Sequence, residues 1–414
     1  MVGYTSVIFR GAKLWGGYRR MAISPSLRLV QSLGTDFQTV RSPLRICPLG
    51  AHVDHQHGLV TAMALNEGLH FHYRPREDGV VSVRSGNFEG IEEFSFDDVP
   101  REDRKSWGAY LRGAVLSLQR DFTLKRGLEG VIEGRIPTGG LSSSAAVCTA
   151  YLTALADVNE ISLAPLELVS YAHWIEREYI GLKNGILDHA ANVLSKEQAL
   201  LLLDCEDHSY EHVPQPESME EFCFLLVYSG VSKSLITTGY NNRVDECRAA
   251  AWFLAEAAGT LDGRPLNEMT LRAVGEDVFH TYKHILPGRF RRRAEHFFSE
   301  CERVRQGVEA WRAGDLKRFG QLMNESGQSS IENYESGCPE LIALYEILRE
   351  CPGVYGTRFS GAGFRGFCIA LVDPARVADI EGRVREEYPK RFPERAKDLQ
   401  IYTCSSDNGV EIVR

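Results

Sequence analysis

The feature that most constrains this chain is a glycine- and serine-rich turn that runs directly into an apolar helix. Residues 137–146 read Pro-Thr-Gly-Gly-Leu-Ser-Ser-Ser-Ala-Ala, and residues 147–155 continue as an apolar, helix-forming run. Backbone amides at a helix start are unpaired and lie at the positive end of the helix dipole, so they bind anions. The three serines add hydroxyl groups for a phosphate or for a cation bound to it.

Two less specific interpretations of this turn are a flexible Gly/Ser linker and a helix capped by Ser142. The segment also lacks the Gly-Lys-Ser/Thr of the common P-loop. A linker, however, does not continue straight into an apolar helix. The pattern therefore favours a phosphate-binding turn.

The composition is that of an ordinary globular protein and excludes several classes of function. The chain has 414 residues, enough for two or three domains with ample core. Its 47 basic and 56 acidic residues give a net charge of −9, which argues against nucleic-acid binding. No apolar run approaches the roughly 18 residues of a membrane span. Ten cysteines without CxxC spacing indicate reduced thiols in a cytoplasmic protein.

Residues 1–24 are expected to form an N-terminal extension outside the fold. The first 35 residues contain no Asp or Glu, and their basic residues are Arg10, Lys13, Arg19, Arg20 and Arg28. An acid-poor, arginine-containing start is typical of an organelle transit peptide. Serine is sparse there, which favours the alternative of upstream sequence before a start at Met21.

Helices and strands alternate loosely along the chain, which favours an α+β fold over a doubly wound parallel sheet. Polar residues accumulate over 205–221, so we expect an N-terminal lobe over 25–215 and a C-terminal lobe over 216–414. Asp78-Gly79 is typical of a hairpin turn. The expected helices span 26–33, 107–118, 142–156, 164–178, 184–194, 244–258, 293–313, 316–324, 339–350 and 374–388. The expected strands span 69–73, 79–84, 92–96, 127–134, 199–203, 222–228, 366–372 and 399–403.

A second motif, residues 45–58, concentrates an arginine, three histidines and an aspartate between apolar flanks. A loop that binds a polar substrate ranks first, with Asp54 accepting hydrogen bonds from hydroxyl groups. A solvated loop ranks second. A metal site ranks third, formed by His52, Asp54, His55 and His57.

A third motif places Asp188 among apolar residues, four positions after a possible helix cap at Asn184. A buried carboxylate needs a partner or a chemical task, although a local structural hydrogen bond is the plainer interpretation of Asp188 taken alone. A fourth motif, residues 356–366, is a glycine-rich turn before a strand. By itself it is weak evidence for any function.

Taken in order, the four motifs resemble the superfamily of galactokinase, homoserine kinase, mevalonate kinase and phosphomevalonate kinase. Residues 137–146 match its phosphate loop, and residues 356–366 match its C-terminal glycine-rich motif. Residues 45–55 match the sugar signature of galactokinases, Arg-x-Asn-Leu-Ile-Gly-Glu-His-x-Asp-Tyr. The resemblance covers about residues 40–404. It implies two α+β lobes with the active site in the cleft between them, and ATP and Mg²⁺ as cofactors.

Departures from the galactokinase signature point to a different sugar. Ala51 stands where galactokinases have the Glu that approaches the C6 hydroxyl, Cys47 replaces Asn, and His55 replaces Tyr. A Glu facing C6 would repel a carboxylate by about 1–4 kcal/mol at ~4 Å. Its replacement by Ala suits a uronic acid. The amino-acid sequences of the motifs also resemble those of plant-type galacturonokinases. The implied reaction converts ATP and D-galacturonic acid to α-D-galacturonic acid 1-phosphate and ADP.

The resemblance also implies a role for individual residues. Asp188 corresponds to the catalytic aspartate, which would take the proton of the C1 hydroxyl, and Arg45 corresponds to its cationic partner. Ser144 and Glu176 correspond to the Mg²⁺ ligands. Sugar contacts are expected from Ala51, His52, Asp54 and Tyr240. The ATP phosphates are expected to lie on Gly139, Gly140, Leu141, Ser142, Ser143, Ser144 and Ala145.

Two rival functions stay open: galactokinase itself, acting on D-galactose, and a non-catalytic sugar sensor on the same fold. The intact phosphate loop and Asp188 disfavour the sensor. The expected partners are a small sugar acid and ATP, without nucleic acid or membrane, and the oligomeric state is left open. Candidates for the cation that faces a C6 carboxylate are His52, His55 and Arg243, with backbone amides as an alternative.

Overall fold

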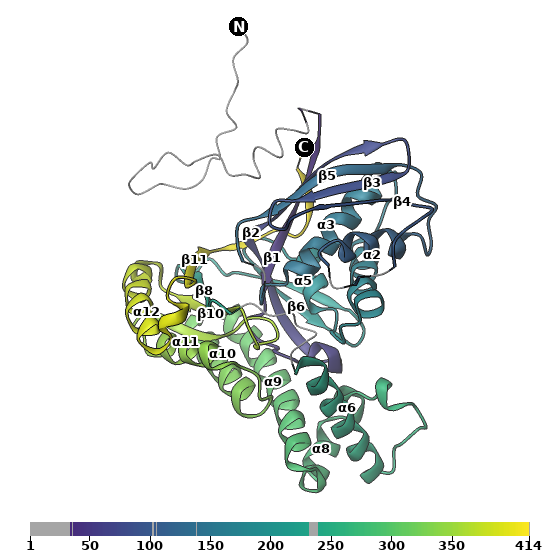
Figure 1. Cartoon of the computed structure of the whole chain (residues 1–414). Coiled ribbons are helices and arrows are strands. Elements are labelled where there is room, and N and C mark those ends of the chain that lie inside the picture. Colours follow the sequence, from purple (N-terminus) through teal and green to yellow (C-terminus); the bar gives the residue numbers. More distant parts are fainter. Residues whose placement is uncertain are drawn as a thin grey trace.

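The computed structural model describes residues 34, 36–101, 103–104, 106–137, 139–231 and 239–413. The expected extension over 1–24 and the expected helix over 26–33 lie outside these residues, as does Thr138 of the phosphate-loop motif. Two sheets with helices packed on them confirm the α+β class (Figure 1). Each expected helix and strand within the described residues is present, with shifted ends.

The larger sheet has nine strands and is built around the long strand β2 (Leu59–Arg76). Its main path is β13-β1-β2-β5-β3-β4, while β12 and β6 pair with β2, and β7 pairs with β6. Alternate residues of β2, such as Phe71 and Tyr73, are buried on one face because successive side chains of a strand point to opposite faces. The other strands are β1 (Gln38–Ile46), β3 (Val80–Ser85), β4 (Ile91–Ser95), β5 (Gly127–Gly134), β6 (Ala199–Asp204), β7 (Tyr210–Pro214), β12 (Ser406–Asp407) and β13 (Glu411–Val413).

The expected hairpin at Asp78-Gly79 is wrong, because β2 and β3 are not neighbours in the sheet. Strand β5 lies between them, antiparallel to β2 with Leu69 opposite Gly134, and parallel to β3 with Val81 opposite Leu128. Parallel pairing requires a long crossover, here through β4 and a helix. The turn residues thus reverse the chain without pairing the strands that they join.

Helices α3 (Ser143–Val158) and α5 (Leu187–Leu194) pack on β1 and β2. Helices α2 (Ala109–Leu118) and α4 (Pro165–Trp174) pack on α3 in turn. The ring of Tyr151 on α3 meets Phe71 edge to face at 5.1 Å between centroids. After α4 the chain continues as one π-helical turn, Ile175–Ile180. These helices cover one face of the larger sheet (Figure 1).

The smaller sheet has four antiparallel strands in the order β11-β8-β10-β9. Its inner strands are continuous apolar runs because helices cover both faces. Phe224 and Leu226 face the core shared with α9 and α10, whereas Leu225 and Val227 face α11 and α12. The elements are β8 (Cys223–Tyr228), β9 (Val354–Phe359), β10 (Phe367–Val372), β11 (Gln400–Cys404), α9 (Gly288–Arg312), α10 (Leu316–Glu332), α11 (Pro339–Arg349) and α12 (Val377–Arg391).

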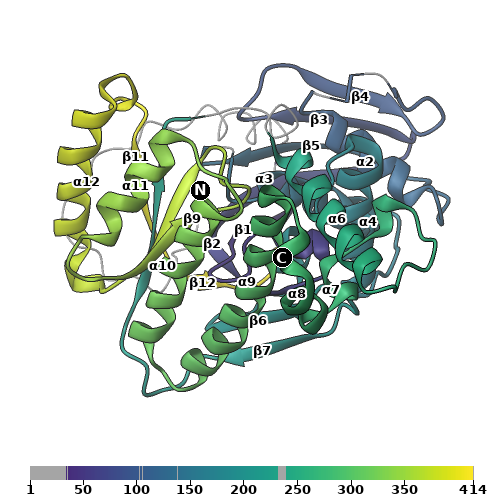
Figure 2. The same ribbon diagram turned by 90° about the horizontal axis from the view of Figure 1, so that it is seen from below.

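A helical block lies in the chain between β8 and β9. It contains α6 (Tyr240–Ala257), α7 (Leu271–Val274), α8 (Glu276–Tyr282) and the long helix α9. Helix α9 packs on α6 and α10 and also reaches β2 and β7 of the larger sheet (Figure 2). It therefore ties the block to the larger sheet, and its residues Val304 and Trp311 share a core with Phe224 of the smaller sheet.

The end of the chain returns to the larger sheet. Strand β12 pairs with β2, and β13 pairs with the outer edge of β1. Strand β7 ends in the larger sheet at Pro214, and β8 begins the smaller sheet at Cys223. The division of the chain into lobes at 215/216 stays a prediction.

The ten cysteines are free thiols, as their spacing predicted. All except Cys223 and Cys338 are buried, so they pack as small apolar side chains. Among the described residues, the structure contains no helix with the length and hydrophobicity of a membrane span.

Helix α10 and strand β9 approach each other to backbone contact through two glycines. A Cβ atom on Gly320 would lie 2.2 Å from the carbonyl oxygen of Tyr355, and one on Gly356 would lie 2.0 Å from the carbonyl oxygen of Gly320. Neither backbone oxygen can move without shifting the strand or the helix. The position of β9 therefore depends on the absence of two side chains.

We predict that Gly320→Ala lowers the Tm and costs about 1–3 kcal/mol of unfolding free energy, as overpacking does. Gly382→Ala on α12 is the matched control, because a Cβ there meets no atom within 4 Å. The control should be neutral or raise stability by up to about 1 kcal/mol. Thermal and urea unfolding of both variants test this, and an unchanged Tm in Gly320→Ala would contradict it.

Candidate active site

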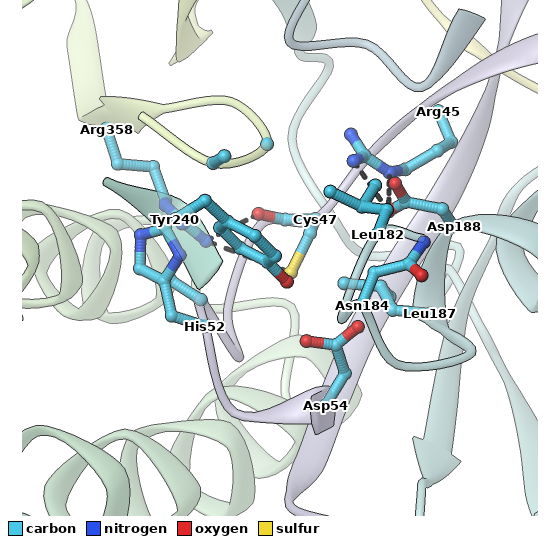
Figure 3. Close-up of a pocket in the computed structure, with 13 residues that line it drawn as sticks. Arg45, Cys47, His52, Asp54, Leu182, Asn184, Leu187, Asp188, Tyr240 and Arg358 are labelled. Carbon is cyan, nitrogen blue, oxygen red and sulfur yellow. Dashed lines mark hydrogen bonds and ion pairs between the residues drawn. The ribbon is translucent and has the colours of Figure 1, made fainter. Parts of the chain in front are cut away.

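Three adjoining pockets lie where the larger sheet, the smaller sheet and the helical block meet. We call them the first pocket, the loop pocket and the aromatic pocket. The first pocket is lined by Arg45, Cys47, Ala51, His52, Asp54, Leu182, Asn184, Leu187, Asp188, Tyr240, Arg358, Gly361 and Ala362 (Figure 3). The loop pocket is lined by Arg45, Gly139, Gly140, Ser142, Ser143, Ser144, Leu182, Asp188, Gly361, Ala362, Gly363 and Arg365.

The aromatic pocket shares Ser143, Ser144, Leu182 and Arg365 with the loop pocket. Its remaining lining is mostly apolar and includes the rings of Trp107 and Tyr110. The three pockets thus form one continuous path, along which the loop pocket lies in the middle. Most of the predicted site residues line this path, but the side chains of Leu141 and Ala145 are buried and line none of the three pockets.

Arg45 and Asp188 form an ion pair on the wall shared by the first pocket and the loop pocket. Arg45 is near the end of β1, and Asp188 is in the first turn of α5. The Nε and Nη2 atoms of Arg45 donate to Oδ1 of Asp188 at 2.8 and 2.6 Å. The Arg45 side chain is 3% exposed and that of Asp188 is 25% exposed, so the carboxylate keeps access to the pockets. Arg45 Nη1 also donates to the carbonyl oxygen of Gly140, at 3.3 Å.

The loop before Asp54 is held by a buried carboxylate on α9. Glu300 Oε1 accepts hydrogen bonds from the amides of Gly50 and Ala51 at 2.9 and 3.0 Å and from the hydroxyl of Ser326. Its Oε2 pairs with Arg303 at 2.7 Å. Burial alone would raise the pKa of Glu300, but Arg303 and neighbouring groups hold it well below its usual range. Glu300 is therefore a structural anion behind the pocket wall.

Two of the three histidines in this motif are packing residues. His52 stacks on Tyr334 with 4.1 Å between ring centroids, and His55 Nε2 lies 3.0 Å from the hydroxyl of Tyr334. Burial lowers the pKa of His52 well below its usual value and lowers that of His55 to about 3, so both rings are neutral at pH 7. Among the described residues, no three metal-ligating side chains are arranged around a common point.

Asp54 and Tyr240 also line the first pocket, and Figure 3 shows Tyr240 across from Asp188 and Asp54 below Asn184. Asp54 opens a short 3₁₀ turn, and Tyr240 opens α6. Burial and the charge of Asp188 raise the pKa of Asp54 to about 6. A carboxylate in such a position gains from any ligand that donates hydrogen bonds to it.

The phosphate-loop motif forms the N-terminal entry of α3. Ser142 occupies the cap position with φ 56°, but its side chain makes no capping bond, so the interpretation of a helix capped by Ser142 is wrong. Its buried hydroxyl has no hydrogen-bond partner within the described part of the chain. An unpaired, buried hydroxyl thus lies beside the start of a helix, where backbone amides favour an anion.

The fourth motif packs directly on this loop. A Cβ on Gly361 would lie 2.9 Å from the carbonyl oxygen of Gly140, and one on Gly366 would lie 2.6 Å from that of Gly139. The hydroxyl of Ser360 donates to the Gly140 carbonyl at 2.6 Å. The glycines of the two motifs are therefore needed so that two backbones can touch.

Ser144 and Glu176 lie together in the aromatic pocket. Glu176 is 1% exposed, and its Oε2 accepts a hydrogen bond from Asn184 at 2.6 Å and lies 3.2 Å from His189 Nε2. Burial opposes its ionisation, yet contacts with His189, Ser144 and Asn184 keep the pKa of Glu176 below its ordinary value. An ionised carboxylate beside a hydroxyl is a donor set that Mg²⁺ prefers.

Two arginines that face the pockets were assigned no role from the sequence, although both belong to the fourth motif. Arg358 lines the first pocket, and Arg365 lines the loop and aromatic pockets. Arg365 lies against the phosphate loop, because a Cβ on Gly139 would be 3.0 Å from its Nη1 atom. In the sequence, only their position beside a glycine-rich turn indicated that these two arginines could belong to the site.

Comparison with known proteins places these motifs in context. Models of the N-terminal and C-terminal domains of GHMP kinases match residues 109–196 and 308–390. A galacturonokinase from Arabidopsis thaliana is 44% identical, over 93% of this chain and 96% of its own length. A galactokinase from Roseiflexus sp. (strain RS-1) is 32% identical, over 90% of this chain and 92% of its own.

Solved structures agree with the fold. The crystal structure of Lactococcus lactis galactokinase complexed with galactose has a TM-score of 0.84 and 29% identity, covering 93% of this chain and 98% of that one. Methanococcus jannaschii mevalonate kinase has a TM-score of 0.65 at 15% identity and covers 91% of this chain and 100% of that one, which is a likeness of fold alone.

The neutral histidines predict a loss of stability in acid. Below pH 6.5 the unfolded chain protonates His55, whereas the folded chain does not do so until about pH 3, so stability falls as the pH falls. Between pH 7 and pH 5, His55 alone should lower the free energy of unfolding by about 2 kcal/mol. His55→Gln should therefore reduce the difference in unfolding free energy between pH 7 and pH 5 by about that amount.

Urea unfolding at the two pH values measures this difference. His280→Gln is the control, because His280 is exposed on α8 and should change the difference by less than ~0.5 kcal/mol. Equal pH dependence in wild type and His55→Gln would mean that His55 is charged or mobile in the folded state.

Proposed function

The chain belongs to the GHMP kinase family, and on that premise we propose that it phosphorylates D-galacturonic acid at C1 with ATP. The products are α-D-galacturonic acid 1-phosphate and ADP. The single observation that carries the proposal is the ion pair of Arg45 and Asp188, which lies between a polar pocket and a phosphate loop. An acceptor hydroxyl and a phosphate can therefore meet at one carboxylate.

In the proposed reaction, Asp188 accepts the proton of the C1 hydroxyl as the oxygen attacks the γ-phosphorus. Both hydrogen bonds from Arg45 end on Oδ1, which leaves Oδ2 for that proton. The guanidinium of Arg45 then faces the negative charge that develops on the attacking oxygen. Phosphoryl transfer needs little covalent help from the protein, so positioning and charge neutralisation supply most of the acceleration.

The phosphate chain of ATP is proposed to lie along the loop pocket. The amides of residues 139–145 and the free hydroxyl of Ser142 would bind its oxygens. Ser144 and Glu176 would hold Mg²⁺, which when bound neutralises part of the phosphate charge. The apolar walls of the aromatic pocket, with Trp107 and Tyr110, suit the nucleoside end of ATP.

The sugar is proposed to lie in the first pocket. Asp54 and Tyr240 would bind its hydroxyl groups, and the backbone around His52 would complete the wall. Ala51 presents only a methyl group there, which leaves room for a carboxylate and adds no charge against it. The 44% identity to a galacturonokinase, against 32% to a galactokinase, supports the sugar acid over galactose.

We also propose an N-terminal lobe over 25–215 and a C-terminal lobe over 216–414, with residues 406–413 crossing back to the larger sheet.

A cytoplasmic location is supported by ten free thiols, which are typical of a reducing compartment.

ADP release measured with galacturonate, galactose, glucuronate and mevalonate tests the proposed function. Galacturonate should give the highest kcat/KM. Preference for galactose would favour the galactokinase alternative, and sugar binding without turnover would favour a sensor.

Asp188→Asn should lower kcat by about 10²–10⁴-fold, because the amide cannot accept the proton. The protein should stay folded, because Oδ1 of the Asn can still accept the hydrogen bonds of Arg45, although loss of the ion pair should lower the Tm. Steady-state kinetics and thermal unfolding check both statements. A lower Tm with near wild-type kcat would instead indicate a purely structural carboxylate.

Ala51→Glu should lower kcat/KM for galacturonate by roughly 10–10³-fold, because the new carboxylate would repel the sugar acid. Galactose should gain somewhat, since the Glu can accept a hydrogen bond from its C6 hydroxyl. Ala51→Gln is the matched control for size without charge, and it should lower kcat/KM for galacturonate by less. Unchanged galacturonate kinetics in Ala51→Glu would show that residue 51 does not face C6.

A further inference from the structure

Arg358 is a buried cation in the wall of the first pocket. It lies on β9, is 1% exposed, and shares the pocket with Cys47, Ala51 and His52 (Figure 3). Figure 3 also shows that Arg358 and Asp188 lie on opposite sides of the pocket. A ligand that fills the pocket would therefore contact both.

The guanidinium of Arg358 has fewer partners than it can bind. Its Nη1 donates to the carbonyl oxygens of Cys47 at 2.7 Å and Pro48 at 3.4 Å, but its Nε has no partner among the described residues. The Cys47 thiol supplies no anion, because burial raises its pKa to about 11. A buried charge without a hydrogen-bonded anion is costly, so this arrangement indicates that a ligand supplies that anion.

The carboxylate behind the wall is already bound. Both oxygens of Glu300 are used, Oε1 by two backbone amides and a serine hydroxyl, and Oε2 by Arg303. Glu300 therefore lowers the cost of burying Arg358 without occupying its donors. Arg358 lines the pocket, and its Nη2 atom makes no hydrogen bond among the described residues, so Nη2 is the donor left for a ligand.

The other cations considered for this pocket are engaged or neutral, and Arg365 lines the loop and aromatic pockets instead. Arg45 is paired with Asp188, and Arg243 donates to Glu246 and does not line the pocket. His52 and His55 are neutral at pH 7, because burial lowers their pKa. Of the two arginines in the described lining of the first pocket, only Arg358 lacks a carboxylate partner.

We propose that Arg358 binds the C6 carboxylate of the sugar acid and so determines the preference for it. This inference rests on the proposed function. The planar guanidinium matches a carboxylate in shape, and a charged hydrogen bond is strong in a site from which water is excluded. With its carboxylate at Arg358, the sugar presents its C1 end to Asp188 across the pocket.

The test compares an acid with its neutral counterpart in two variants, Arg358→Met and Arg358→Lys. KM and kcat are measured for D-galacturonate, its methyl ester and D-galactose, and galacturonate binding is measured by calorimetry without ATP. In Arg358→Met, galacturonate should bind roughly 10²-fold more weakly, whereas KM for the ester and galactose should change by less than ~3-fold. Arg358→Lys keeps the charge but not the two-pronged donor geometry of the guanidinium, so the loss of galacturonate affinity should be intermediate.

Arg243→Met is the matched control and should weaken all three sugars equally or not at all. If Arg358→Met does not fold, Arg358→Lys decides the question, because lysine can still donate to the Cys47 carbonyl. Equal losses for acid and ester in the Arg358 variants would overturn the inference and assign Arg358 a structural role. Failure of the proposed function would appear separately, in the wild type, as no turnover of galacturonate.

Discussion

The contact between the phosphate loop and the loop after β9 is the constraint on which the rest of the structure depends. The Gly140 carbonyl accepts hydrogen bonds from Ser360 and Arg45, and Gly361 and Gly366 let the two backbones touch. One loop belongs to the larger sheet and the other to the smaller sheet. Because they meet, the residues of both sheets share one pocket, and Arg45 is fixed between the loop and Asp188.

The sequence predicted the long helices and the inner strands well, because their apolar periodicity is strong. It did not predict β1, whose pattern contains Arg41 and Pro43, or β7, which lies in the polar stretch over 205–221. The insertion of β5 between β2 and β3 was also missed, since a turn sequence reports only local geometry. Local signals found the elements, and pairing between distant segments decided their order.

The same division holds for the candidate site. Arg45, Asp54 and Asp188 stand in motifs whose composition already indicated chemistry, and the fold brings them to one pocket. No role could be assigned to Arg358 from its own motif. Its place in the pocket depends on contacts with Cys47, 311 residues away, and on the small side chain at position 51. Glu300 was likewise missed, since a glutamate in a charged helix looks solvated until the fold buries it. His52 and His55 were expected as candidate cations, but burial, which the sequence does not report, keeps them neutral.

The pairing of β13 with β1 has a consequence for synthesis of the chain on the ribosome. Arg41 on β1 and Glu411 on β13 form an ion pair although they are 370 residues apart. Until the last strand emerges, one edge of β1 has no partner among the described strands. At ~5–20 residues per second that interval lasts about 20–70 s. An unpaired strand edge invites pairing with other chains, so the nascent protein is most exposed to aggregation through β1 during this interval.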